Sequence, residues 1–108
     1  MISLHPGLEV VPNEYQGREY EVEIVCPEFT CVCPRTGQPD FAEIRIRYTP
    51  DSGIVELKSL KLYLVSFRDM GIFHEHATNR ILDDFVAASR PIRCVVEGDW
   101  NMRGGIKT

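Results

Sequence analysis

The chain has 108 residues, of which 44% are hydrophobic and 26% are charged, and its formal net charge at pH 7 is -4. This length suits one domain that folds without disulfides or structural metals, so the four cysteines are expected to be reduced thiols. The acidic balance argues against nucleic acid as a partner, and no apolar run reaches the roughly 18 residues that a membrane span requires.

The N-terminal stretch shows neither a targeting signal nor a regular element. MISLHPGLEVVP has no basic region followed by an apolar core, so the protein is predicted to be cytoplasmic. Proline and glycine recur through residues 1–18 without a hydrophobic period, which predicts an arm over the surface or against a neighbouring subunit. Residues 19–108 are predicted to form the single folded domain.

Two segments with strict alternation predict two strands. From Tyr20 to Cys26 apolar side chains alternate with glutamates, which is typical of a half-buried strand that Pro27 ends or bulges. Residues 42–48 alternate in the same way, with alanine, isoleucine and tyrosine inward and glutamate and arginine outward. Turn-forming residues at 49–53 then close the second strand.

Residues 55–68 change to a helical period and predict an amphipathic helix. Its core face is predicted to hold Leu57, Leu60, Tyr63, Leu64 and Phe67. Glu56 opens the first turn, where a carboxylate also suits the helix dipole. The cations Lys58, Lys61 and Arg68 fall on a separate stripe, which is either an anion site or an ordinary solvated surface.

A second helix is predicted from about 74 to 89. Its core face is predicted to hold Phe73, Ala77, Ile81, Phe85 and Ala88. His74 and Glu75 occupy its first turn, where compensation of the dipole is the ordinary explanation for a glutamate. Residues 92–97 alternate as a third strand, and residues 99–108 have room for a short fourth one.

This order of elements predicts an α+β fold in which two helices lie on one face of an antiparallel sheet. A single layer of this kind leaves its sheet edges exposed. Natural proteins cover or pair such edges, and closure of strands between subunits into a barrel would pair them.

The segment CVCPRTGQPDF at 31–41 places one thiol and one carboxylate among turn-forming residues. Such turns can bring Cys33 and Asp40 together. A nucleophilic cysteine needs an electropositive or hydrogen-bonding setting, and a separate acid serves the product atom. Cys33 and Asp40 fit these two roles; a buried structural thiol and an ordinary turn aspartate are the alternative.

Four stretches of the chain are distinctive in combination: CPEFTCVCPRTGQPDFAEI at 26–44, ELKSLKLYLVSFRD at 56–69, FHEH at 73–76 and RGGI at 103–106. Together they resemble the NADPH-dependent 7-cyano-7-deazaguanine reductases, the QueF nitrile reductases. The resemblance implies the tunnelling fold, in which subunits join their sheets into a barrel-shaped ring. It therefore implies a homo-oligomer with active sites between subunits.

The resemblance also implies the chemistry. Cys33 would add to the nitrile carbon of 7-cyano-7-deazaguanine to give a covalent thioimide, and Asp40 would donate a proton to the nitrogen. Two hydride transfers from NADPH would then give the primary amine without a metal. The residues implied to hold the substrate are Val55, Glu56, Leu57, His74 and Glu75.

The cofactor has its own implied residues. The family signature E-[SL]-K-[SA]-x-K-[LYFW] matches residues 56–62 and is associated with NADPH. With the RGG segment it assigns NADPH to Lys58, Ser59, Lys61, Arg103 and Gly104. No glycine-rich strand-to-helix fingerprint of a dinucleotide-binding βαβ unit is present.

Two other functions compete with nitrile reduction. The shorter archaeal relatives, amidinotransferases acting on tRNA-bound nitrile, lack the lysine signature that this chain keeps. A metal-binding structural protein could use C-x-C at 31–33 with H-x-H at 74–76, because zinc accepts such ligands. Against it, two residues that are two apart on a helix point to different faces.

Overall fold

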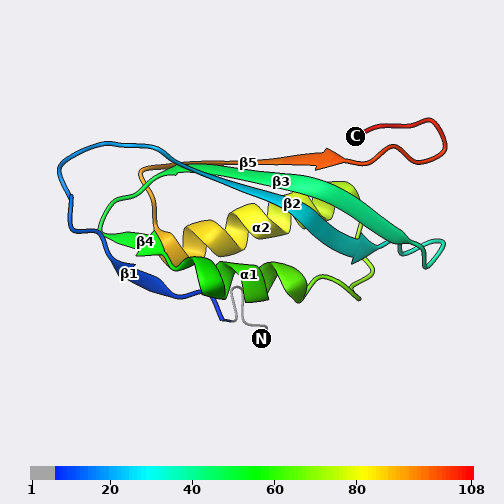
Figure 1. The fold of residues 1–108 in the computed structure, drawn as a ribbon, viewed down its shortest axis with the longest axis horizontal. Coiled ribbons are helices and arrows are strands. Elements are labelled where there is room, and N and C mark those ends of the chain that lie inside the picture. Colours follow the sequence, from blue (N-terminus) through cyan, green and yellow to red (C-terminus); the bar gives the residue numbers. More distant parts are fainter. Residues whose placement is uncertain (1–6) are drawn as a thin grey trace.

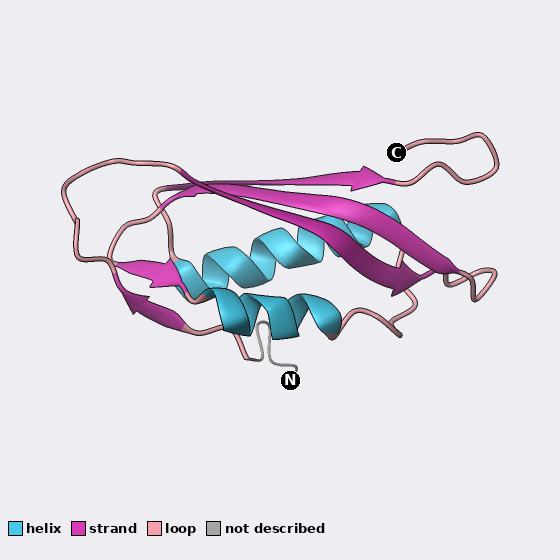
Figure 2. Ribbon diagram, in the orientation of Figure 1, coloured by secondary structure: helices cyan, strands magenta, loops and turns pink. Residues whose placement is uncertain are grey.

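Two helices cover one face of a three-stranded antiparallel sheet, and a short two-stranded ribbon flanks them (Figure 1, Figure 2). The structure, a computed structural model, describes residues 7–108, so residues 1–6 of the predicted arm lie outside the described residues. The elements are β1 (Val10–Pro12), β2 (Val22–Val32), β3 (Pro39–Thr49), β4 (Gly53–Val55), α1 (Leu57–Val65), α2 (His74–Ser89) and β5 (Arg93–Trp100). The predicted α+β class, with both helices on one face of the sheet, is confirmed.

The sheet has the order β2-β3-β5, so β2 and β5 form its edges. The pairing of β2 with β3 runs from Val22 opposite Tyr48 to Val32 opposite Pro39. The register shifts between Cys26 and Phe29. Pro27 lies in this shift, because a proline cannot donate to the ladder. It therefore bulges the strand rather than ending it.

The inward faces of the sheet and the helices form one core. Ala42, Ile44, Ile46 and Tyr48 are all buried, as their alternation predicts. The helices add Leu60, Tyr63, Leu64, Phe67, Ala77, Ile81 and Phe85. Leu57 and Phe73 were predicted to join them, but their side chains are 61% and 43% exposed. Both stand at helix starts, where the helical period no longer turns a side chain onto the sheet.

Two short elements, β1 and β4, have no counterpart among the predictions. Residues 10–12 of the N-terminal stretch form β1, which pairs with β4 from Val10 opposite Val55 to Pro12 opposite Gly53. A Cβ on Gly53 would lie 2.3 Å from a methyl carbon of Val10, so only glycine permits this close pairing. The ribbon depends on a partner about forty positions away, which a local hydrophobic period cannot reveal.

The helix and strand ends also differ from the expected ranges. Val55 belongs to β4, so α1 begins two residues later than predicted, and it ends at Val65. The residues after β5 form a tight turn closed by Arg103 and Ile106 instead of a fourth strand. Both glycines of this turn have positive φ angles, 57° for Gly104 and 80° for Gly105.

Among the described residues 7–108, neither helix is long and apolar enough to cross a membrane.

Candidate active site

Cys33 stands at the start of the loop that joins β2 to β3. Its N–H donates to the Gln38 carbonyl at 2.8 Å, and its carbonyl accepts from the N–H of Gly37 at 2.9 Å. One step back along the hairpin ladder, Cys31 lies opposite Asp40. Side chains on paired strands alternate, so Cys31, Cys33 and Asp40 share one face. Cys33 follows the end of this ladder by one residue, and the charge of Asp40 acts on its thiol, so the two residues lie near each other.

The two thiols of this hairpin differ in reactivity. The hydroxyl of Thr36 lowers the pKa of Cys33 by hydrogen bonding, and the backbone N–H groups of Arg35 and Thr36 lower it further. Burial raises the pKa of Cys31 to about 11, with a smaller effect from the charges of Asp40 and Cys33. Cys33 is therefore the better nucleophile of the pair.

Asp40 is not a loop residue but the second residue of β3, and its side chain is only 8% exposed. Arg103 Nη1 lies 3.0 Å from Oδ1 and also donates to the carbonyl of Pro39. His74 Nε2 lies 3.2 Å from Oδ2. Both oxygens of the Asp40 carboxyl group therefore have a partner. One of these partners, Arg103, is the arginine that the family resemblance assigns to the cofactor.

The imidazole ring of His74 packs on the indole ring of Trp100. The two rings stack with centroids 4.0 Å apart and an interplanar angle of 3°. A Cβ on Gly98 would lie 2.7 Å from Trp100 Nε1 and 2.8 Å from Thr78 Oγ1, so this glycine makes room for the indole. The sequence prediction missed Trp100, although the alternation Cys94, Val96, Gly98 continues to it and would have extended the third strand.

A shallow hollow of about 240 Å³ opens beside this stack. It is lined by His74, Glu75, Thr78, Asn79, Gly98, Trp100 and Thr108. Glu75 is exposed on its wall, in the first turn of α2. The two residues predicted to hold the substrate from α2 therefore lie next to the thiol hairpin. We use the name hairpin end for the residues around the thiol and the carboxyl group described above, which are Cys33, Asp40, His74, Trp100 and Arg103.

The other predicted substrate residues lie at the opposite end of the molecule (Figure 1). The N–H of Val55 donates to the hydroxyl of Tyr48 at 3.1 Å. Tyr48 comes eight positions after Asp40 on β3, which corresponds to roughly 26 Å along a strand. We call Val55, Glu56 and Leu57 the cap end. Within one chain the structure does not bring the two ends together.

Glu56 caps α1 with both carboxylate oxygens. They accept from the N–H groups of Lys58 and Ser59, each at 2.8 Å. These backbone hydrogen bonds lower the pKa of Glu56, and the bond from Lys58 has the largest effect. Ser59, predicted to bind the cofactor, is buried, and its hydroxyl joins the carbonyl of Glu56 to the N–H of Glu9. The predicted favourable placement of Glu56 at the helix start takes the form of a side-chain cap.

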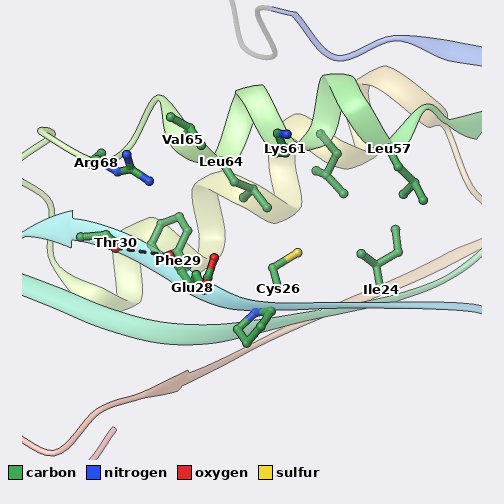
Figure 3. Close-up of a pocket in the computed structure, with 12 residues that line it drawn as sticks. Ile24, Cys26, Glu28, Phe29, Thr30, Leu57, Lys61, Leu64, Val65 and Arg68 are labelled. Carbon is green, nitrogen blue, oxygen red and sulfur yellow. Dashed lines mark hydrogen bonds between the residues drawn. The ribbon is translucent and has the colours of Figure 1, made fainter.

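A groove of about 330 Å³ runs between α1 and the edge strand β2 (Figure 3). Apolar side chains from both elements line most of it, with Lys61 and Arg68 on the helix side and Glu28 on the strand side. Within residues 7–108, neither these two cations nor the exposed Lys58 pairs with a carboxylate. Free cations beside an apolar groove fit the phosphates and rings of a dinucleotide.

The structure also bears on the metal-binding alternative. In the part of the chain that the structure describes, no three His, Cys, Asp or Glu side chains are arranged to hold a metal ion. Cys31, one member of the C-x-C pair, is fully buried in the core.

Two helices on one face of a three-stranded antiparallel sheet define the class of protein as α+β, and a solved structure identifies the arrangement as the tunnelling fold. The crystal structure of the archaeosine synthase QueF-Like in the apo form superposes with a TM-score of 0.76. The superposition covers 82% of this chain and 86% of that one at 23% identity, so it shows the fold.

Sequence relatives give the family. The profile described as QueF-like protein matches residues 39–108. A protein of Anaeromyxobacter dehalogenans, named NADPH-dependent 7-cyano-7-deazaguanine reductase, is 62% identical over 94% of this chain and 83% of its own length. Proteins with the same name from Thermomicrobium roseum and Chlorobaculum tepidum are 61% and 56% identical, covering 94% and 92% of this chain and 79% and 85% of theirs. The chain belongs to the QueF-like family.

Proposed function

We propose that the protein reduces the nitrile of 7-cyano-7-deazaguanine to 7-aminomethyl-7-deazaguanine with NADPH, as a step of tRNA queuosine biosynthesis. The names of relatives that are 56–62% identical support this activity. The observation that carries it is the thiol of Cys33, with its lowered pKa, on the same face of the hairpin as Asp40.

The first step is the addition of Cys33 to the nitrile. The thiolate forms a carbon–sulfur bond, one π bond of the nitrile breaks, and the nitrogen takes a proton from Asp40. The products are a thioimide and the Asp40 carboxylate. NADPH, when bound, supplies one hydride in each of two successive reductions. Lys58 and Lys61 would hold its phosphates beside the groove.

We further propose that the hairpin end of one subunit meets the cap end of another in a homo-oligomer. In the part of the chain that the structure describes, no strand pairs with the outer edges of β2 and β5 apart from an isolated bridge at Val32, and Leu57, Leu62 and Val65 of α1 are exposed apolar side chains. Joining β2 of one subunit to β5 of the next would cover these edges and build the barrel. Glu56 and Glu75 would then both be available to a guanine-like edge.

Mixing two inactive variants tests the shared site. Cys33→Ala removes the nucleophile and Glu56→Ala removes the carboxylate of the cap end, so each variant alone is expected to be inactive. Co-assembled subunits would contain some sites with both native residues, and part of the activity would return. Light scattering should give a mass several times 12.3 kDa. A monomer, or no recovery on mixing, would contradict the proposal.

A mass measurement tests the reaction itself. Incubation with 7-cyano-7-deazaguanine alone should raise the protein mass by one substrate, and addition of NADPH should remove the adduct as amine is released. Cys33→Ala should form no adduct. Cys94→Ala is the matched control, because burial raises the pKa of Cys94 to about 11 and leaves it a poor nucleophile. An adduct on any other cysteine would overturn the assignment.

We place the enzyme in the cytoplasm, since all four cysteines are free and the reaction requires a reduced Cys33.

A further inference from the structure

The guanidinium of Arg103 reaches Asp40 from a segment outside the sheet. Its Nη1 lies 3.0 Å from Oδ1 of Asp40 and donates to the carbonyl of Pro39, the preceding residue. The arginine thus contacts a main-chain and a side-chain oxygen of neighbouring residues. The contact with Pro39 fixes the guanidinium nitrogen against the main chain of β3, so the Asp40 carboxyl group meets a charged donor at a fixed position.

The main chain carries Arg103 to this place. The N–H of Asn101 donates to the carbonyl of Phe41 at 2.9 Å, which continues the β3–β5 ladder by one bond. The N–H of Trp100 donates to the carbonyl of Thr108 at 3.1 Å, which folds the end of the segment back onto the strand. Between these anchors the turn at 103–106 is closed by two backbone hydrogen bonds of 3.0 Å.

We propose that Arg103 is a positioning residue for Asp40, acting in the step in which Cys33 adds to the nitrile, before any cofactor is needed. This inference rests on the function proposed above. In that step Asp40 loses its proton to the nitrile nitrogen and becomes a carboxylate. The guanidinium already beside Oδ1 stabilises this new charge without rearrangement, as preorganised donors do.

In the part of the chain that the structure describes, Arg103 contacts Oδ1 of Asp40 and His74 contacts Oδ2. Cys31 lies opposite Asp40 on β2, and Cys33 follows at the start of the loop. We expect the fixed position of the Arg103 guanidinium and its stabilisation of the carboxylate product to speed the addition, so removal of Arg103 slows it.

The rate of adduct formation without NADPH tests the proposal. Arg103→Met should slow the adduct about 10- to 100-fold, the effect of a misplaced reacting group. Arg103→Lys, which keeps the charge but not the planar guanidinium, should give a rate between those of Arg103→Met and the native protein. Lys107→Met is the matched control: Lys107 is a cation of the same segment that contacts Asp99 and the carbonyl of Trp100 but not Asp40. It should keep the native rate.

Chemical rescue separates positioning from folding. In Arg103→Ala, guanidinium chloride at low millimolar concentration should restore part of the adduct rate, whereas sodium chloride should not. A native or faster adduct rate in Arg103→Met overturns the proposal. It does so even if the same variant has a raised Michaelis constant for NADPH, because that result would assign Arg103 to the cofactor alone. An equal loss in Lys107→Met, or no rescue, also overturns it. If the native protein itself forms no adduct, the proposed function has failed first.

Discussion

The hairpin end and the cap end of this molecule are built in different ways. At the hairpin end each charged group has a partner: Asp40 contacts Arg103 and His74, and His74 stacks on Trp100. At the cap end the carboxylate of Glu56 accepts hydrogen bonds from the backbone N–H groups of Lys58 and Ser59, and the neighbouring Leu57 is exposed. The hairpin end is thus held together by contacts between its own side chains, whereas the cap end leaves an apolar side chain exposed to solvent.

This difference indicates a division of labour. Chemistry needs reacting groups held in place before the substrate arrives, which in the proposed function is the role of the hairpin end. Recognition needs free surface, which in the same proposal is the role of the cap end with the adjoining groove. Changes at the hairpin end should therefore act mainly on rate, and changes along α1 mainly on binding and on stability.

Asp40→Asn should have the largest of the effects predicted below. The amide keeps the size of the side chain but cannot donate a carboxylic proton, so adduct formation should slow by about 10²- to 10⁴-fold. Nitrile binding should change little, and quenching of Trp100, the single tryptophan, can follow it. Asp99→Asn, on the exposed end of β5, is the control. If Asp40→Asn instead lost nitrile binding and formed the adduct at the normal rate, the hairpin end would serve binding and not the reaction, contrary to the comparison above.

Lys61→Glu tests the groove along α1. Reversal of a charge near cofactor phosphates should raise the Michaelis constant for NADPH about tenfold and leave that for the nitrile unchanged. Arg93→Glu, an exposed change of the same sign on β5, should affect neither constant. Equal increases for both ligands would mean that the lysine shapes the helix and does not contact the cofactor.

Thr36→Val should have a smaller effect, confined to the thiol. The Thr36 hydroxyl is the largest cause of the lowered pKa of Cys33, so its loss raises that pKa and reduces the thiolate present at pH 7. Alkylation by iodoacetamide should shift to higher pH, and adduct formation at pH 7 should fall a few-fold. Both rates should recover in alkaline buffer. An unchanged alkylation profile would show that the backbone bonds suffice.

The last and smallest effect is that of Glu56→Gln on thermal stability. Since folding lowers the pKa of Glu56, the stability that its charge contributes is present above the pKa of the unfolded chain and is lost as pH falls through the folded value. The melting temperature of the native protein should therefore drop on acidification by more than that of the glutamine variant. Parallel curves would indicate that the cap needs no charge.

Local pattern in the sequence determined the elements of this fold. Strict alternation at 42–48 and the helical period through α2 depend on neighbouring residues, and the burial of Ile44, Ile46, Ile81 and Phe85 follows from it. The segment with Cys33 and Asp40 could be recognised for the same reason, since turn-forming residues place a thiol and a carboxylate in one hairpin.

The tertiary structure alone decided which distant residues meet. Pairing of β1 with β4, stacking of Trp100 on His74 and delivery of Arg103 to Asp40 join residues 26 to 63 positions apart. Such contacts leave no period in the sequence, because they depend on where whole elements pack. The separation of Glu56 from Cys33 has the same origin: β3 and α1 carry the two residues to opposite ends of the molecule.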